Sequence, residues 1–148
     1  MSEYKPYLSA IQVYAKPETV RDEPGYRVSF SDGWGEDLYW MPKDQFEAHY
    51  FPIKDEDKLN LDDISHMVTE SNIDTMTLGS KTTVVQMTLP TGFVYTESSS
   101  CVDPKNYDAV IGKKCCLDRM TNKLWQHLGF VLQWARHGLI YNRQEEKA

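Results

Sequence analysis

The N-terminal third of the chain alternates apolar and polar residues over short segments that turn residues separate. Residues 11–15 and 26–30 alternate with a period of two, which predicts two strands. A turn at Gly33 then leads into a return strand over residues 37–41. An apolar pair four residues apart predicts a short helix over residues 42–50. This part of the chain is therefore expected to form a β-hairpin with a short helix.

The middle of the chain predicts a helix followed by a second hairpin. Apolar residues at helical spacing predict a helix over residues 64–68, with Asp62 or Asp63 as its N-cap. Residues 82–89 are dense in β-branched side chains and precede a Pro-Thr-Gly turn, after which residues 93–96 return. An antiparallel hairpin is expected there.

The C-terminal part predicts one long helix. Asp103 stands directly before Pro104, an arrangement typical of a capped helix start. The apolar spacing continues to about Leu128, and Gly129 is expected to end the helix. The core is predicted to contain apolar residues of the hairpin and of this helix: Leu89, Phe93, Val110, Leu117, Met120, Leu124, Trp125 and Leu128.

Together these elements predict the α+β class, with a small antiparallel β-hairpin module joined to a domain built from a helix, a β-hairpin and a long helix. The expected organisation is a β-rich module over residues 1–51, an acidic linker over 52–63, the second domain over 61–134 and a tail over 135–148.

Charge is divided unevenly along the chain. The 148 residues carry a formal net charge of -6, which argues against a uniformly cationic nucleic-acid-binding protein. Residues 1–75 hold seven basic and 16 acidic residues, a net of -9, whereas residues 76–148 hold nine and six, a net of +3. Such a split suggests two units with different surfaces. No apolar run is long enough for a membrane-spanning helix, and no secretory signal is expected, so we expect a cytoplasmic protein.

Residue types that commonly bind metals, act as nucleophiles or bind phosphate do not form a recognisable site in this sequence. The three cysteines, Cys101, Cys115 and Cys116, lack metal-site spacing and are expected to be free thiols, the last two as packing residues. Ser98 to Cys101 favour a capping turn over a nucleophile, because no histidine is placed beside them. Gly112 lies inside the predicted helix and suggests close packing rather than a phosphate loop. We therefore expect no enzyme, no catalytic residue, no metal and no cofactor.

The second half of the chain resembles a family of small bacteriophage accessory proteins named after genes of Shigella phage Sf-six and coliphage N-four. The resemblance covers residues 61–134. It rests on a hairpin, a Glu-Ser-x-x-Cys-Val-x-Pro segment and a helix, at these positions: Leu89, Gly92, Phe93, Glu97, Ser98, Cys101, Val102, Pro104, Ile111, Gly112, Lys114, Lys123, Trp125 and Gly129. The chain departs from the family at Cys116, where small residues are usual, and at Gln126, where proline is frequent. The resemblance implies a phage origin and carries no established activity.

These observations lead to three functional hypotheses. The first is an accessory protein that acts in the infected bacterial host by binding a host protein complex for defence or nucleic-acid processing. Its contact residues are predicted to be an exposed loop tryptophan and nearby carboxylates: Trp34, Glu36, Asp37, Asp55, Glu56 and Asp57. The second is nucleic-acid binding through a basic helix that carries Lys113, Lys114, Arg119 and Lys123. The third is a virion or assembly component, which predicts a homo-oligomer.

Overall fold

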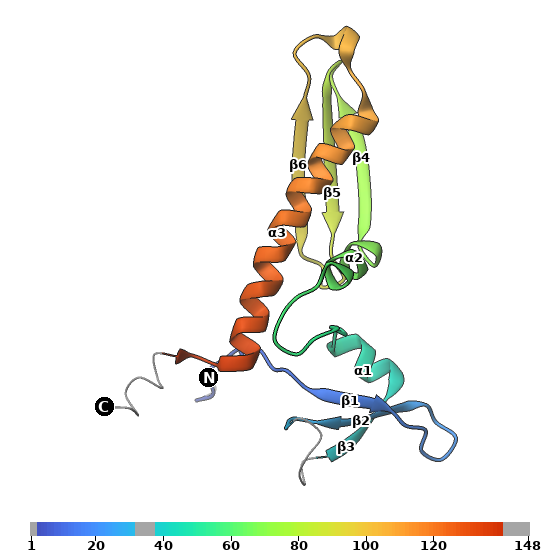
Figure 1. Cartoon of the computed structure of the whole chain (residues 1–148), viewed down its shortest axis with the longest axis vertical. Helices are drawn as coiled ribbons and strands as arrows, with labels where there is room; N and C mark the ends of the chain where they lie inside the picture. Colours follow the sequence, from blue (N-terminus) through green and yellow to red (C-terminus); the bar gives the residue numbers. More distant parts are fainter. Residues whose placement is uncertain (1–2, 32–37, 141–148) are drawn as a thin grey trace. The chain divides into compact units, whose positions relative to one another are not determined.

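The computed structural model describes residues 3–31 and 38–140. The chain divides into two compact units, one from Met1–Pro52 with Phe130–Ala148 and the other from Ile53–Gly129. Each unit holds one antiparallel three-stranded sheet, accompanied by helices (Figure 1). The predicted α+β class is confirmed. The predicted boundaries of the acidic linker and of the C-terminal tail stay predictions.

The sheet of the first unit has the order β1-β2-β3. Its elements are β1 (Tyr14–Pro17), β2 (Gly25–Ser29) and β3 (Leu38–Pro42), and α1 (Lys43–His49) follows β3 directly. The predicted pairing of the second strand with its return strand is confirmed. The first strand begins at Tyr14 rather than at Ile11 and includes Pro17, which is tolerated because β1 is an edge strand.

Three close contacts involve the elements of this sheet and its helix. Gly25 lies under the indole of Trp40, where a Cβ would stand 2.4 Å from Trp40 Cζ2, so glycine is required. The same indole donates a hydrogen bond of 2.8 Å to the carbonyl of Glu18. In α1, Phe46 stacks on Tyr50 with ring centroids 4.8 Å apart, which confirms the predicted apolar pair.

The second unit combines a sheet of order β4-β5-β6 with helices. Its elements are α2 (Leu61–Thr69), β4 (Asn72–Leu78), β5 (Thr82–Thr88), β6 (Val94–Ser100), the 3-10 helix η1 (Pro104–Asn106) and most of α3 (Ala109–His137). The predicted hairpin corresponds to β5 and β6 and is confirmed. Strand β4 was not predicted, because this edge strand is exposed along nearly all its length and has no sustained alternation of apolar residues.

The long helix begins and ends later than predicted. Asp103 caps η1 instead of α3, since its Oδ1 accepts a hydrogen bond of 3.1 Å from the Lys105 N–H. The cap of α3 is Asp108, whose Oδ1 accepts from the Val110 N–H at 2.9 Å. Gly129 lies inside the helix, which continues to His137, and Gly138 follows with a φ of +62°.

One face of the second sheet packs against α3 (Figure 1). Gly112 permits this approach, because a Cβ there would lie 2.3 Å from Thr83 Oγ1. The predicted close packing at Gly112 is confirmed. The buried hydrophobic side chains at this interface and beside α2 are Ile64, Met67, Val85, Met87, Leu89, Tyr95, Cys116, Met120 and Leu124.

The predicted core is right in its centre and wrong at its edges. Leu89, Met120 and Leu124 are buried as expected. Leu117, Trp125 and Leu128 are only half-buried. Phe93 is 58% exposed because it precedes β6, where Tyr95 takes the inward position. Val110 is 77% exposed because it lies in the first turn of α3, away from the buried stripe.

Candidate functional site

The acidic segment before α2 is an ordered loop that a buried carboxylate holds in place. Asp63 lies in the first turn of α2 and is buried. Its Oδ1 accepts from the Lys54 N–H at 3.0 Å and its Oδ2 from the Asn60 N–H at 2.8 Å. The N-cap of α2 is Asn60, not Asp62 or Asp63 as predicted. The prediction failed because Asp63 acts from the third position of the helix and reaches back to the cap.

Three of the six predicted partner-binding residues lie on this loop. Asp55 is half-buried, and its Oδ2 accepts a hydrogen bond of 2.6 Å from Asn60 Nδ2. Glu56 and Asp57 are exposed. The remaining three, Trp34, Glu36 and Asp37, lie outside the described residues.

Two of the four predicted nucleic-acid-binding residues converge on one carboxylate. Glu97 on β6 forms an ion pair with Lys123, and Arg119 Nη1 lies 3.7 Å from Glu97 Oε2. Arg119 also donates a hydrogen bond of 2.6 Å to the carbonyl of Ser98. The hydrogen bond from Lys123 holds the pKa of Glu97 below its usual value, aided by the charges of Lys123 and Arg119 and opposed by burial. These two basic side chains therefore join α3 to the edge strand β6.

The other two predicted basic residues do not share this position. Lys113 and Lys114 are exposed on α3, and neighbouring helical residues point about 100° apart. Because Arg119 and Lys123 turn toward β6, the four side chains do not form a single stripe. The structure thus brings together one pair of the predicted set and leaves Lys113 and Lys114 near the start of the helix.

A small hollow lies where α3 begins. Its volume is about 120 Å³, and its lining includes Lys81, Cys101, Tyr107 and Ile111. The Tyr107 hydroxyl is hydrogen-bonded to Thr77 Oγ1 and to Thr83 Oγ1, at 2.8 and 2.9 Å. The Cys101 thiol donates to the carbonyl of Asp103 at 3.2 Å. This arrangement supports the structural interpretation of Cys101, since its thiol is engaged with the turn that leads into η1.

The two neighbouring cysteines of α3 differ in environment. Cys116 is fully buried against the sheet, with Sγ 4.0 Å from the carbonyl of Thr83, and burial raises the pKa of its thiol. Cys115 is half-buried. Both are free thiols, and the prediction that they serve as packing residues is confirmed for Cys116. Across residues 3–31 and 38–140, no group of three or more His, Cys, Asp or Glu side chains could hold a metal ion.

A tyrosine and a histidine form a contact that sequence reasoning missed. The buried Tyr95 on β6 has its hydroxyl 2.6 Å from Nδ1 of His127 on α3, and burial raises the pKa of Tyr95. The Phe93 ring meets both rings edge-on, with centroids 5.8 Å away. No sequence spacing indicates this contact, because it joins residues on different elements.

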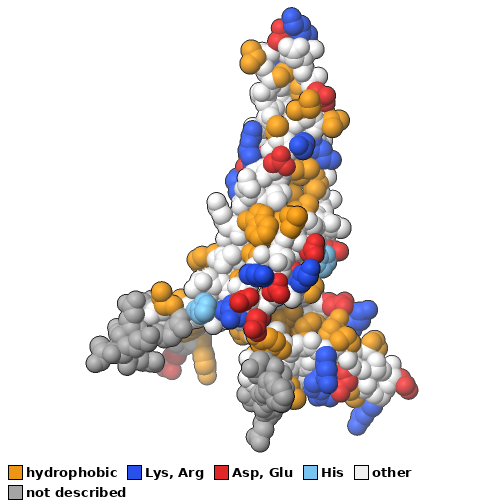
Figure 2. Space-filling model, in the orientation of Figure 1, with side chains coloured by type: hydrophobic (Ala, Val, Ile, Leu, Met, Phe, Trp, Pro, Cys, Tyr) orange, Lys and Arg blue, Asp and Glu red, His pale blue; other side chains and the backbone are white. Residues whose placement is uncertain are grey.

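Exposed apolar side chains that were not predicted lie at the end of the second unit where α3 begins. Val102 is 95% exposed, and Val110 and Ile111 are 77% and 62% exposed. The exposure of Val110 and Ile111 follows from helical spacing, because both lie outside the buried stripe through Gly112, Cys116 and Met120. Figure 2 shows apolar side chains beside Lys and Arg side chains on this end.

Comparisons with known proteins identify the family of this chain. Residues 53–135 match the Phage protein (N4 Gp49/phage Sf6 gene 66) family, which confirms the suspected resemblance. Neither the curated proteins nor the solved structures gave a match. The described helices include none long and apolar enough to cross a membrane. Since the match covers more than half of the 148 residues, the chain belongs to the N4 Gp49/phage Sf6 gene 66 family of phage proteins.

Proposed function

We propose that this phage protein is a non-enzymatic accessory protein that acts in the infected bacterium by binding and modulating a host protein complex. The observation that carries the proposal is the exposure of three aliphatic side chains, Val102, Val110 and Ile111, at one end of the second unit. Burying apolar surface contributes about 25 cal/mol per Å², so a protein partner that covered these side chains would gain affinity. Exposed apolar clusters next to polar residues are typical of protein interaction sites.

The hollow at the start of α3 supports binding through a surface rather than catalysis in a pocket. Its volume of about 120 Å³ is small. Ligand pockets commonly measure roughly 300 to 1,000 Å³. The Tyr107 hydroxyl in the hollow already bonds to two threonines, and the Cys101 thiol already bonds to a carbonyl. Neither contact pairs a nucleophile with a general base.

The acidic residues remain part of the proposed contact. In this proposal, the carboxylates Asp55, Glu56 and Asp57, and also Glu36 and Asp37, present negative charge to cationic groups of the host protein. Trp34 supplies an aromatic contact. Asp55 also supports the loop through Asn60, so its replacement would combine two effects. Asp57 is therefore the better residue to change.

The proposal is tested by affinity capture of the tagged full chain from lysate of infected cells. The capture is run at low and high salt, with and without nuclease, and the bound proteins are quantified by mass spectrometry. We expect one host protein at fixed stoichiometry that nuclease does not release. Asp57→Lys should reduce its recovery, whereas Asp118→Lys, a matched change on α3, should not.

The other hypotheses give different results in the same experiment. Recovery of many proteins that nuclease removes would favour nucleic-acid binding through Lys113, Lys114, Arg119 and Lys123. Recovery only with phage particles would favour a virion or assembly role and a homo-oligomer. Either result would overturn the proposed function.

A further inference from the structure

The two ends of the sheet in the second unit differ in charge. Strand register defines these ends: Asn72 pairs with Thr88 at one end, and Leu78 pairs with Thr82 at the other. Seven-residue strands separate the ends by roughly 20 Å at 3.4 Å per residue. The loop over residues 53–60 and α2 adjoin the first end, and the start of α3 adjoins the second.

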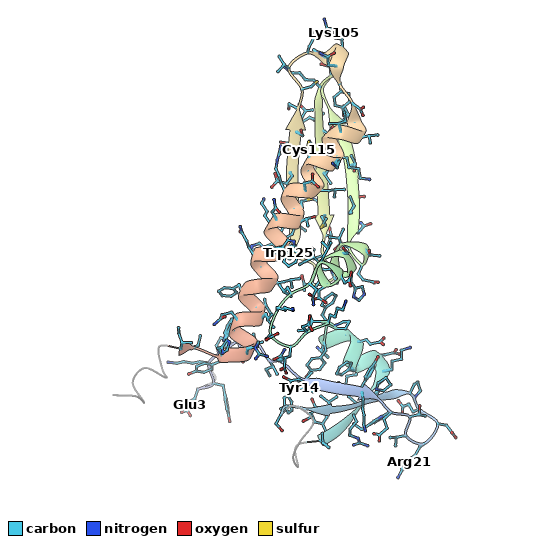
Figure 3. All side chains as sticks on the ribbon, in the orientation of Figure 1. Glu3, Tyr14, Arg21, Lys105, Cys115 and Trp125 are labelled. Carbon is cyan, nitrogen blue, oxygen red and sulfur yellow. The ribbon has the colours of Figure 1, made fainter. Side chains whose placement is uncertain are left out.

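The end where α3 begins carries an excess of positive charge. Four lysines lie there, Lys81, Lys105, Lys113 and Lys114, against two aspartates, Asp103 and Asp108. Both aspartates accept hydrogen bonds from backbone N–H groups. The Lys105 side chain is 78% exposed, and Figure 3 shows it at the end of the unit away from α2. Asp103 also pairs with a lysine, since Lys105 Nζ lies 3.5 Å from its Oδ2, and all four lysines are exposed.

The exposed aliphatic side chains lie among these lysines. Val102 follows β6, and Val110 and Ile111 lie in the first turn of α3, separated from Lys113 and Lys114 only by Gly112. Lys81 Nζ donates to the carbonyl of Val102 at 3.4 Å, which places an ammonium group beside the backbone of that residue. We call these residues the far-end surface: Lys81, Val102, Lys105, Val110, Ile111, Lys113 and Lys114.

The hollow opens on the far-end surface. Lys81 and Ile111 belong both to its lining and to the surface. The lining thus includes an aliphatic residue, Ile111, and a cationic one, Lys81, together with Tyr107, whose hydroxyl is bonded to Thr83 of β5. A hollow of about 120 Å³ with this lining suits a small apolar group of a partner, with a lysine beside it.

We propose that the far-end surface binds an acidic protein segment, which seats one aliphatic side chain against Ile111 and pairs its carboxylates with the four lysines. The proposal rests on the proposed function, since it supplies the chemistry of the host partner. Charge complementarity selects an acidic segment, and the aliphatic contacts select a protein over a bare polyanion. Nucleic acid fits less well, because the aromatic side chain at this end, Tyr107, is half-buried and its hydroxyl is bonded on both sides.

Direct binding of defined probes to the full chain tests this surface. The probes are a labelled peptide that alternates Glu-Glu with Leu, the same peptide with Gln for Glu, a single-stranded oligothymidylate and vesicles of anionic phosphatidylglycerol. We expect the acidic peptide to bind at least tenfold more tightly than the glutamine peptide. Its amide chemical-shift changes should centre on residues 102 and 110–114.

Variants assign the effect to the far-end surface. The Lys113→Glu, Lys114→Glu double variant should weaken binding of the acidic peptide at least tenfold. The Val110→Ser, Ile111→Ser double variant should weaken it at least threefold. Lys43→Glu with Lys58→Glu makes the same charge change at exposed positions elsewhere and should alter binding by less than twofold. Circular dichroism establishes that each variant is folded.

Several results would overturn the proposal. These are equal binding of the acidic and glutamine peptides, tighter binding of the oligonucleotide or the vesicles, or shift changes centred away from the far-end surface. The host-protein capture separates this failure from failure of the proposed function. If the Lys113→Glu, Lys114→Glu variant still captures the host protein, the far-end surface is wrong and protein binding stands. If the wild-type chain captures none, the proposed function itself fails.

Discussion

Gly112 of α3 and Thr83 of β5 approach so closely that a Cβ on the glycine would lie 2.3 Å from Thr83 Oγ1. Thr83 is fully buried, and its hydroxyl also bonds to Tyr107. The contact therefore sets the distance between the helix and the sheet and positions the connection that leads into α3. The far-end surface depends on it, because Val110 and Ile111 lie in the turn just before Gly112.

Gly112→Ala is predicted to destabilise the second unit. The new methyl group must push against the buried Thr83, which costs about 1 to 3 kcal/mol in a packed core. Urea unfolding followed by circular dichroism measures the change. Gly129→Ala is the matched control: nothing lies within 4 Å of its new Cβ. It should stabilise the helix by up to about 1 kcal/mol. Equal effects of the two substitutions would contradict the packing argument.

Asp63→Ala is predicted to destabilise the loop before α2. The substitution leaves the N–H groups of Lys54 and Asn60 without their acceptor, at a cost of about 2 kcal/mol. Asp62→Ala removes an exposed pair with Lys54 and should cost less than about 1 kcal/mol. Hydrogen exchange of the Lys54 and Asn60 amides gives the local readout. Unchanged protection of both amides in Asp63→Ala would show that the carboxylate does not hold the loop.

Glu97 is predicted to make stability depend on acid pH. Its pKa in the folded chain lies below the model-peptide value of 4.5, chiefly through the hydrogen bond from Lys123. A lowered folded pKa contributes stability that is present above pH 4.5 and is lost as the pH falls through the lower folded value. The fall in unfolding free energy between pH 6.5 and pH 3 should therefore be smaller for Glu97→Gln than for the wild type.

The matched control for that pH dependence is Asp118→Asn, which removes an exposed carboxylate from α3, the helix that carries Arg119 and Lys123. The unfolding free energy of this variant should depend on pH as it does in the wild-type chain. A pH dependence of Glu97→Gln that equals the wild-type curve would show that the pairing with Lys123 and Arg119 does not stabilise the fold.

Tyr95→Phe is predicted to lose the bond to His127 without losing the core. The phenyl ring keeps the buried position, so the cost should be about 1 kcal/mol, the typical value of one hydrogen bond. A double-mutant cycle with His127→Phe isolates the interaction. A coupling free energy near zero would show that the 2.6 Å contact does not contribute to stability.

Local signals in the sequence were enough to predict several elements. The hairpin of β5 and β6 could be predicted because a β-branched run, a Pro-Thr-Gly turn and a second run agree with one another. The strand β4 could not, since its residues are exposed at a sheet edge and show no alternation. The predicted end of α3 was wrong, because Gly129 is tolerated inside a long helix, whereas Gly138 after the helix has the positive φ.

The candidate site was harder to predict, because its contacts join distant elements. The sequence predicts that the basic residues of α3 share one charged face. In the structure, Arg119 and Lys123 form ion pairs with Glu97, and this pairing depends on the packing of α3 against β6. The loop before α2 read as a solvated linker, yet Asp63 binds its backbone from inside the helix. The far-end surface combines different segments, since Val102 follows β6 and Val110 lies at the start of α3.

The mass of the native complex tests the central claim most directly. The tagged chain is purified from infected cells after nuclease treatment and is analysed by native mass spectrometry. We predict a species of fixed stoichiometry that contains the chain and one host protein, and that is lost when Lys113→Glu and Lys114→Glu are combined with Asp57→Lys. A spectrum with only the free chain or its homo-oligomers, from cells in which the protein is active, would contradict the claim that it acts by binding a host protein.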